Sequence, residues 1–140
     1  MATIAARLPM SSARGVLALL DDEDNRIRAK ALKILHPLVD TFWVEIAEKV
    51  ETIEILSESE DFEDRELAAA VASKCFYHLE DYDVALNLAL GAGGHFDINA
   101  KTQYVETMLA RGVDRYIQIQ NDGEGADADE RLGKIMEKMF

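Results

Sequence analysis

The chain has 140 residues, of which 49% are apolar, and it carries 27 acidic against 15 basic side chains for a formal net charge of −12. This length predicts one domain with a real core, the apolar content excludes a disordered chain, and the negative charge disfavours binding to a phosphate backbone. Solubility explains the excess of acids, and an acidic face that meets a basic partner is the alternative.

The N-terminal residues allow two readings. Residues 1–15 lack acids and carry Arg7 and Arg14, as transit peptides do. A short frayed terminus is the other reading, and we expect residues 1–11 to be flexible. Ser11 or Ser12 can then cap a short helix, in which the apolar residues are Val16, Leu17, Leu19 and Leu20.

The acidic residues 21–24 end this first helix and provide a cap for the next one, which begins near Asn25. Pro37 lies inside that second helix and removes a backbone hydrogen bond, so a kink or break is expected near residues 34–36. A further helical stretch begins at Trp43 and continues to Leu56 with one apolar face. Residues 57–62 form an acidic connector.

Residues 64–94 read as a helical hairpin. Small and apolar residues recur with helical spacing from Leu67 to Leu79, the turn is at residues 80–81, and a second helix covers residues 82–90. The second helix is apolar almost all round and must be covered on more than one side. Such a hairpin stacks on neighbouring hairpins. Glycine in the left-handed conformation is expected to end it within residues 91–94.

The next helix starts near residues 99–102 and has the cleanest apolar stripe of the chain. This stripe comprises Tyr104, Val105, Met108, Leu109, Gly112, Val113, Tyr116 and Ile117. We therefore predict an all-α domain of stacked antiparallel helix pairs over residues 12–120. An acidic flexible linker follows over residues 121–128, and a truncated helix over residues 129–140.

The final helix places an apolar stripe at the end of the chain. Its predicted interface residues are Leu132, Met136, Met139 and Phe140. Because nothing after them covers the stripe, we expect the chain to be the beginning of a longer protein. The fragment alone is then expected to self-associate through this helix or to be partly disordered there.

Residues with catalytic chemistry do not form a recognisable constellation. His36, His78 and His95 lie on different elements without metal-ligand spacing. Cys75 lies beside Phe76 on an apolar face and is expected to be a small core residue, with a reactive thiol as the alternative. The run at residues 91–95 lacks the lysine and hydroxyl residue of a phosphate loop. The sequence predicts no enzyme, metal site or cofactor, and no segment long enough to span a membrane.

The hairpin resembles a tetratricopeptide-type repeat, in which Ser73, Phe76 and Ala85 would hold the small, aromatic and small positions. Over about residues 12–140 the chain resembles more closely the proteasome/cyclosome-repeat scaffold subunits of the proteasome regulatory particle. The stretches that carry this resemblance are DTFWVEIAEKVETIEIL (40–56), RELAAAVASKCFYHLEDYDVALNLALGAG (65–93), QYVETMLARGVDRYI (103–117) and RLGKIMEKMF (131–140).

This resemblance implies a non-catalytic, all-helical rod that helps to assemble the base of the regulatory particle and supports ubiquitin-dependent degradation. It also implies other lid and base subunits as partners, and a location in cytoplasm and nucleus. Pro37 and the loop at residues 121–129 depart from the family pattern. An independent adaptor that grips a peptide, with Lys74 and Asn87 as candidate contacts, is the alternative function. The large aromatics are expected to be mostly core residues: Phe42, Trp43, Phe76, Tyr77, Tyr82, Phe96 and Tyr104.

Overall fold

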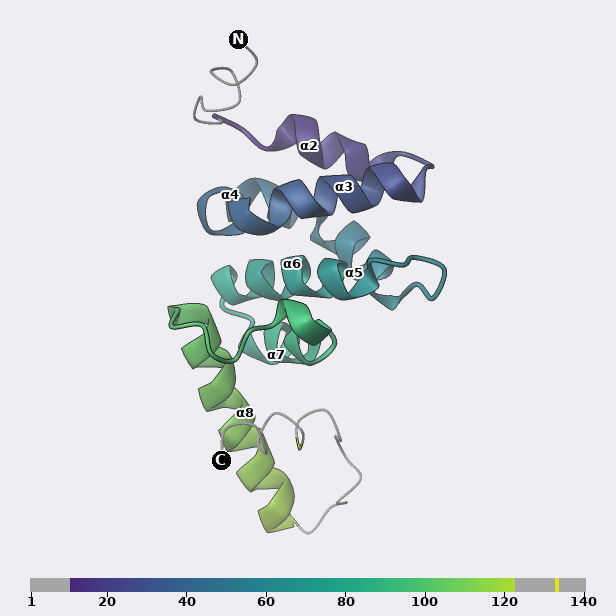
Figure 1. Cartoon of the computed structure of the whole chain (residues 1–140). Helices are drawn as coiled ribbons and strands as arrows, with labels where there is room; N and C mark the ends of the chain where they lie inside the picture. The colour runs from purple at the N-terminus through teal and green to yellow at the C-terminus, as the bar shows by residue number, and fades with distance from the viewer. Residues whose placement is uncertain (1–10, 123–132, 134–140) are drawn as a thin grey trace.

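The computed structural model describes residues 11–122 and residue 133. Every regular element within residues 11–122 is helical, which confirms the predicted all-α class. The α-helices are α2 (Arg14–Ala18), α3 (Asn25–Leu35), α4 (Val39–Ile46), α5 (Val50–Glu58), α6 (Arg65–His78), α7 (Tyr82–Leu90) and α8 (Gln103–Asp122). In Figure 1, α2, α3, α6 and α7 lie across the molecule in successive layers, and α8 descends from them at a steep angle.

The first helices are fixed by acidic side chains. Asp24 caps α3 as predicted, because its carboxylate accepts the Arg26 N–H at 2.9 Å. Ser12 lies one residue before the N-cap Ala13, and its Oγ accepts the Arg14 N–H at 3.2 Å as the predicted cap would, while its hydroxyl donates to Glu45 Oε1 at 2.7 Å. The same carboxylate accepts the Ala13 N–H at 2.8 Å. Glu45 of α4 therefore holds the start of α2.

The predicted break at Pro37 is confirmed. α3 ends at Leu35, and a 3₁₀ turn over His36–Leu38 holds the proline where its missing N–H removes no α-helical bond. The stretch expected from Trp43 to Leu56 is helical throughout, but it consists of α4 and α5, which a 3₁₀ turn at Ala47–Lys49 separates. These turns redirect the chain so that Ile46 and Ile53 are both fully buried.

The hairpin prediction is confirmed, with α6 and α7 joined at Leu79, Glu80 and Asp81. Glu80 has a φ of 64°, and its N–H donates to the carbonyl of Tyr77. The N–H of Asp81 donates to the carbonyl of Phe76. This pair of bonds is a Schellman motif, in which the left-handed position is usually glycine. The chain therefore turns sharply at the cost of a strained glutamate.

α6 is the central helix of the described structure. It packs most extensively against α5 on one side and α7 on the other, and it also contacts α3 and α4. All residues from Leu67 to Ser73 are buried. One apolar cluster joins α6 to the elements before it, and a second joins it to α7 and α8. A helix covered on several sides is what the stacking prediction requires.

Ser73 connects three helices through its hydroxyl group. It donates to the carbonyl of Ala85 in α7 at 2.7 Å and lies 2.6 Å from the hydroxyl of Tyr104 in α8. Ser73 is fully buried, and these contacts satisfy its polar group. Two of the three positions that resemble a tetratricopeptide repeat, Ser73 and Ala85, thus meet through a hydrogen bond.

The segment between α7 and α8 contains the expected left-handed glycine. α7 ends at Leu90 as predicted, and within residues 91–94 it is Gly93 that has a positive φ of 58°, whereas Gly91, directly after the helix, has a φ of −91°. A Cβ at Gly93 would overlap the Glu66 carboxylate. α8 then begins with the predicted hydroxyl cap, since Thr102 Oγ1 accepts the Val105 N–H at 3.2 Å.

The apolar stripe of α8 is buried only in its first half. Tyr104, Val105 and Met108 belong to the second apolar cluster, whereas Tyr116 and Ile117 are 38% and 50% exposed. α8 also continues to Asp122, two residues into the stretch expected to be a linker. The expected flexible N-terminus (1–11), the rest of the linker and the final helix fall almost entirely outside the described residues and stay predictions.

Candidate interaction surfaces

The three histidines are partly brought together. His36 and His95 lie edge to face with ring centroids 6.2 Å apart, a contact that their sequence positions did not indicate. His78 is separate: its Nε2 lies 2.9 Å from Asp40 Oδ1, and its ring stacks on Trp43 at 5.6 Å. No group of three metal-ligating side chains occurs among the described residues. The geometry favours packing roles for these rings.

His36 is the least satisfied of these histidines. Its Nε2 is buried and has no hydrogen-bond partner within the described part of the chain. Burial, reinforced by the positive charges of Lys74 and His95, lowers the pKa of His36 to about 4. The ring is therefore neutral at physiological pH and adds no charge to the interior.

Cys75 is a buried core residue, as predicted. Its Sγ contacts the carbonyl of Trp43 at 3.8 Å, and burial raises the pKa of the thiol to about 11. A thiol with so little thiolate is a poor nucleophile. The predicted core aromatics are also placed inside, since Phe96 and Tyr104 are buried and the other five are half-buried.

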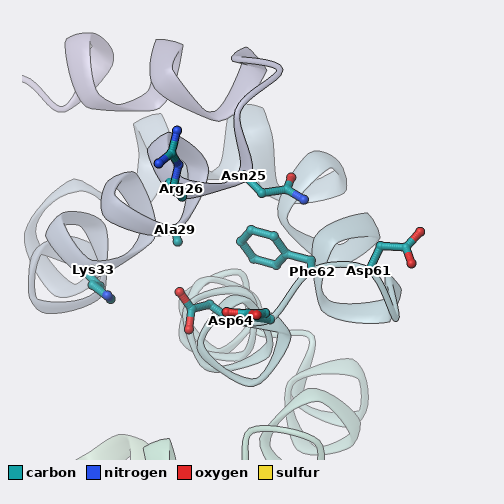
Figure 2. A pocket seen from close by; sticks show the side chains of 8 residues that line it. Asn25, Arg26, Ala29, Lys33, Asp61, Phe62 and Asp64 are labelled. Carbon is teal, nitrogen blue, oxygen red and sulfur yellow. The ribbon is translucent and has the colours of Figure 1, made fainter.

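One hollow, which we call the α3 groove, holds about 530 Å³ between α3 and the connector that precedes α6. Figure 2 shows the Phe62 ring pointing toward Ala29 while the Asp61 carboxylate points away. Arg26 and Lys33 line the α3 side, but the guanidinium of Arg26 lies 3.1 Å from Asp24. Several charges around this groove are thus turned away or already paired.

A second hollow, which we call the α5–α7 groove, holds about 340 Å³. Glu54 and Glu58 line it from α5, Ala69 from α6, and Val84 and Leu88 from α7. It therefore combines an acidic wall from α5 with an apolar wall from α7, and Ala69 of the central helix lies between them. This combination is suited to a ligand with both cationic and apolar groups.

The two residues proposed for a peptide-binding adaptor do not meet. Asn87 lines the α5–α7 groove, whereas Lys74 lines a separate hollow of about 220 Å³ next to Tyr77 and Tyr104. Arg115 of α8 donates to Asn87 Oδ1 at 2.7 Å. Lys74 and Asn87 therefore do not line one common site that could bind a single peptide.

The α3 groove and the α5–α7 groove were not predicted from the sequence, because each is formed by elements that are distant in the chain.

The predicted interface of Leu132, Met136, Met139 and Phe140 lies outside the described residues and stays a prediction. None of the described helices is long and apolar enough to cross a membrane.

Comparison with known proteins decides the family. Residues 11–140 match the family model described as the N-terminal domain of 26S proteasome subunit RPN2. The chain belongs to this RPN2 N-terminal domain family. The match confirms the predicted resemblance and covers every helix of the described structure.

Individual relatives agree with this family. The chain is 44% identical over 138 residues to 26S proteasome non-ATPase regulatory subunit 1 of Drosophila melanogaster, covering 95% of the chain and 14% of the relative. It is 41% identical over 137 residues to homolog A of that subunit in Arabidopsis thaliana, covering 94% and 14%. It is 37% identical over 141 residues to 26S proteasome regulatory subunit RPN2 of Saccharomyces cerevisiae, covering 95% and 15%. The chain thus spans about one seventh of these RPN2 relatives.

Proposed function

We propose that this chain is a non-catalytic scaffold segment of the base of the proteasome regulatory particle, and that it presents helix faces to neighbouring subunits. The observation that carries this proposal is the match of residues 11–140 to the RPN2 N-terminal domain. The relatives are named as regulatory or non-ATPase subunits of the 26S proteasome. These names support a role within a large assembly, where a rigid helical segment would act by contact.

The geometry supports a role in positioning rather than in chemistry. α6 is covered by helices before and after it, and the buried Ser73 hydroxyl joins α6, α7 and α8. Such a stack holds its outer faces in fixed positions. The neutral His36 and the protonated Cys75 add packing rather than reactivity. Lid and base subunits are the proposed partners, and cytoplasm and nucleus the proposed location.

Affinity purification from the source cells tests this function directly. The full-length protein that contains this segment, carrying a tag, should recover 26S proteasome subunits in stoichiometric amounts. A full-length protein with residues 12–120 deleted should recover them less completely. Purification of the intact protein without any proteasome subunit would contradict the proposal.

The C-terminal stripe supplies a second, narrower part of the proposal. We retain Leu132, Met136, Met139 and Phe140 as a contact surface, which the isolated chain covers by self-association. Analytical ultracentrifugation should show dimers that dissociate in a Met136→Lys variant. A monomeric chain whose residues 131–140 are protected from hydrogen exchange would contradict this part.

A further inference from the structure

The two walls of the α5–α7 groove have the same spacing. Glu54 and Glu58 are one helical turn apart on α5, and Val84 and Leu88 are one turn apart on α7. Each of these helices packs along α6, whose Ala69 forms the floor between them. The hollow therefore has an acidic pair on its α5 side and an apolar pair on its α7 side, with Ala69 between them.

The acidic wall is not neutralised within the described structure. Glu54 and Glu58 form no ion pair with any described residue. Arg115 approaches from α8, but it is held by Asn87 and lies 3.9 Å from Asp83. Partial burial and the neighbouring charges of Glu58, Glu51 and Asp81 raise the pKa of Glu54. A cation placed in the groove would relieve this repulsion.

We propose that the α5–α7 groove binds an amphipathic basic helix of a partner protein. Lysine or arginine side chains one turn apart on that helix face Glu54 and Glu58, and adjacent apolar side chains lie on Val84 and Leu88. The matched spacing of both walls fits a helix, because its side chains repeat at i and i+4. The inference rests on the proposed scaffold function and assigns one of its contact faces.

The volume of the groove is consistent with this occupant. About 340 Å³ admits several side chains from one face of a helix, while the helix itself stays outside the hollow. The net charge of −12 attracts cationic partners toward the whole chain. The groove differs from the general surface because it adds an apolar wall, which selects among those partners.

A synthetic helix tests the proposal on the 140-residue chain. The probe is a fluorescent, alanine-based peptide of about 18 residues with one stripe of lysines and an adjacent stripe of leucines. Binding is measured by fluorescence anisotropy, and the contacted residues are mapped by NMR chemical-shift changes. A peptide of the same composition in scrambled order separates helical recognition from plain charge attraction.

The decisive variant is Glu54→Gln with Glu58→Gln, which should weaken binding about five- to tenfold. Glu23→Gln with Glu60→Gln is the matched control, because it removes two charges from exposed positions outside the groove. The control should change binding less than about twofold. Val84→Ala should weaken binding about threefold through the apolar wall.

Loss of binding in the Glu54→Gln, Glu58→Gln variant can be separated from misfolding by its melting temperature. Because the two carboxylates repel each other, their removal should leave the melting temperature unchanged or higher. Equal weakening by both double variants, equal binding of the scrambled peptide, or shifts centred on the α3 groove would each overturn the proposal. Failure here with continued recovery of proteasome subunits by the full-length protein rejects the groove alone. Loss of that recovery rejects the scaffold function.

Discussion

α6 and α8 bury their residues in opposite ways. α6 is buried at every position from Leu67 to Ser73, although its apolar residues do not form one narrow stripe. α8 has a clear stripe, yet only its first half is buried and Ile117 is 50% exposed. The difference arises because α6 has neighbouring helices on several sides. Among the described elements, α8 packs mainly against α7, and only the first half of α8 is buried.

This contrast shows that the spacing of apolar residues along a helix indicates how many of its sides are packed against neighbours. It does not indicate how deeply the helix is buried. A helix with a single apolar stripe has one neighbour, and a helix inside a stack needs small or apolar residues all round. α6 meets this need with alanines at positions 68–70 and 72, which let α5 and α7 approach closely. The stack depends most on the helix with the weakest stripe.

The largest expected effect tests this contrast directly. Leu67→Ala in α6 should lower the free energy of unfolding by about 2–4 kcal/mol, because it leaves a cavity between packed helices. Ile117→Ala in α8 should change it by less than about 0.5 kcal/mol. Urea denaturation of both variants provides the measurement. Similar losses at the two sites would mean that the outer half of α8 is packed as well as α6.

A smaller effect is expected where α6 and α8 meet. Ser73→Ala leaves the Ala85 carbonyl and the buried Tyr104 hydroxyl without this partner, and should cost about 2 kcal/mol. Tyr104→Phe keeps the bond from Ser73 to Ala85 and should cost about 1 kcal/mol. Thermal unfolding of the two single variants and the double variant measures their coupling. Additive losses would show that the two hydroxyl groups act independently.

Much of this fold could be predicted from the sequence. The Pro37 break, the Asp24 cap and the α6–α7 hairpin depend on neighbouring residues, so local rules captured them. The 3₁₀ turn at Ala47–Lys49 contains neither proline nor glycine, so local rules gave no sign of it. The α5–α7 groove was missed because its walls come from two helices separated by α6, which no local rule brings together.

His36 tests the side of α6 that faces the N-terminal helices. Its pKa of about 4 lies below the ordinary 6.5, so the unfolded chain takes up the proton first as pH falls. The stabilisation is complete above pH 6.5 and is lost as pH falls to about 4. We expect a loss of about 1–2 kcal/mol, below the full value of the shift because the ring is partly exposed. Denaturation at several pH values should show a steeper loss for the wild type than for His36→Leu, and parallel curves would contradict this assignment.

The smallest expected effect concerns the turn that ends α6. Glu80 has a φ of 64°, and a left-handed residue with a Cβ costs roughly 1–2 kcal/mol. Glycine removes that strain but adds freedom to the unfolded chain, so Glu80→Gly should stabilise the protein by about 0.5–1 kcal/mol. Asp81→Gly is the matched control, because Asp81 has a φ of −93° and should gain nothing. A thermal unfolding scan in which Glu80→Gly melts no higher than the wild type would show that α6 ends without strain. In that case the close packing of α6 and α7 would depend on the alanines at positions 68–70 and 72, and not on the left-handed turn at Glu80.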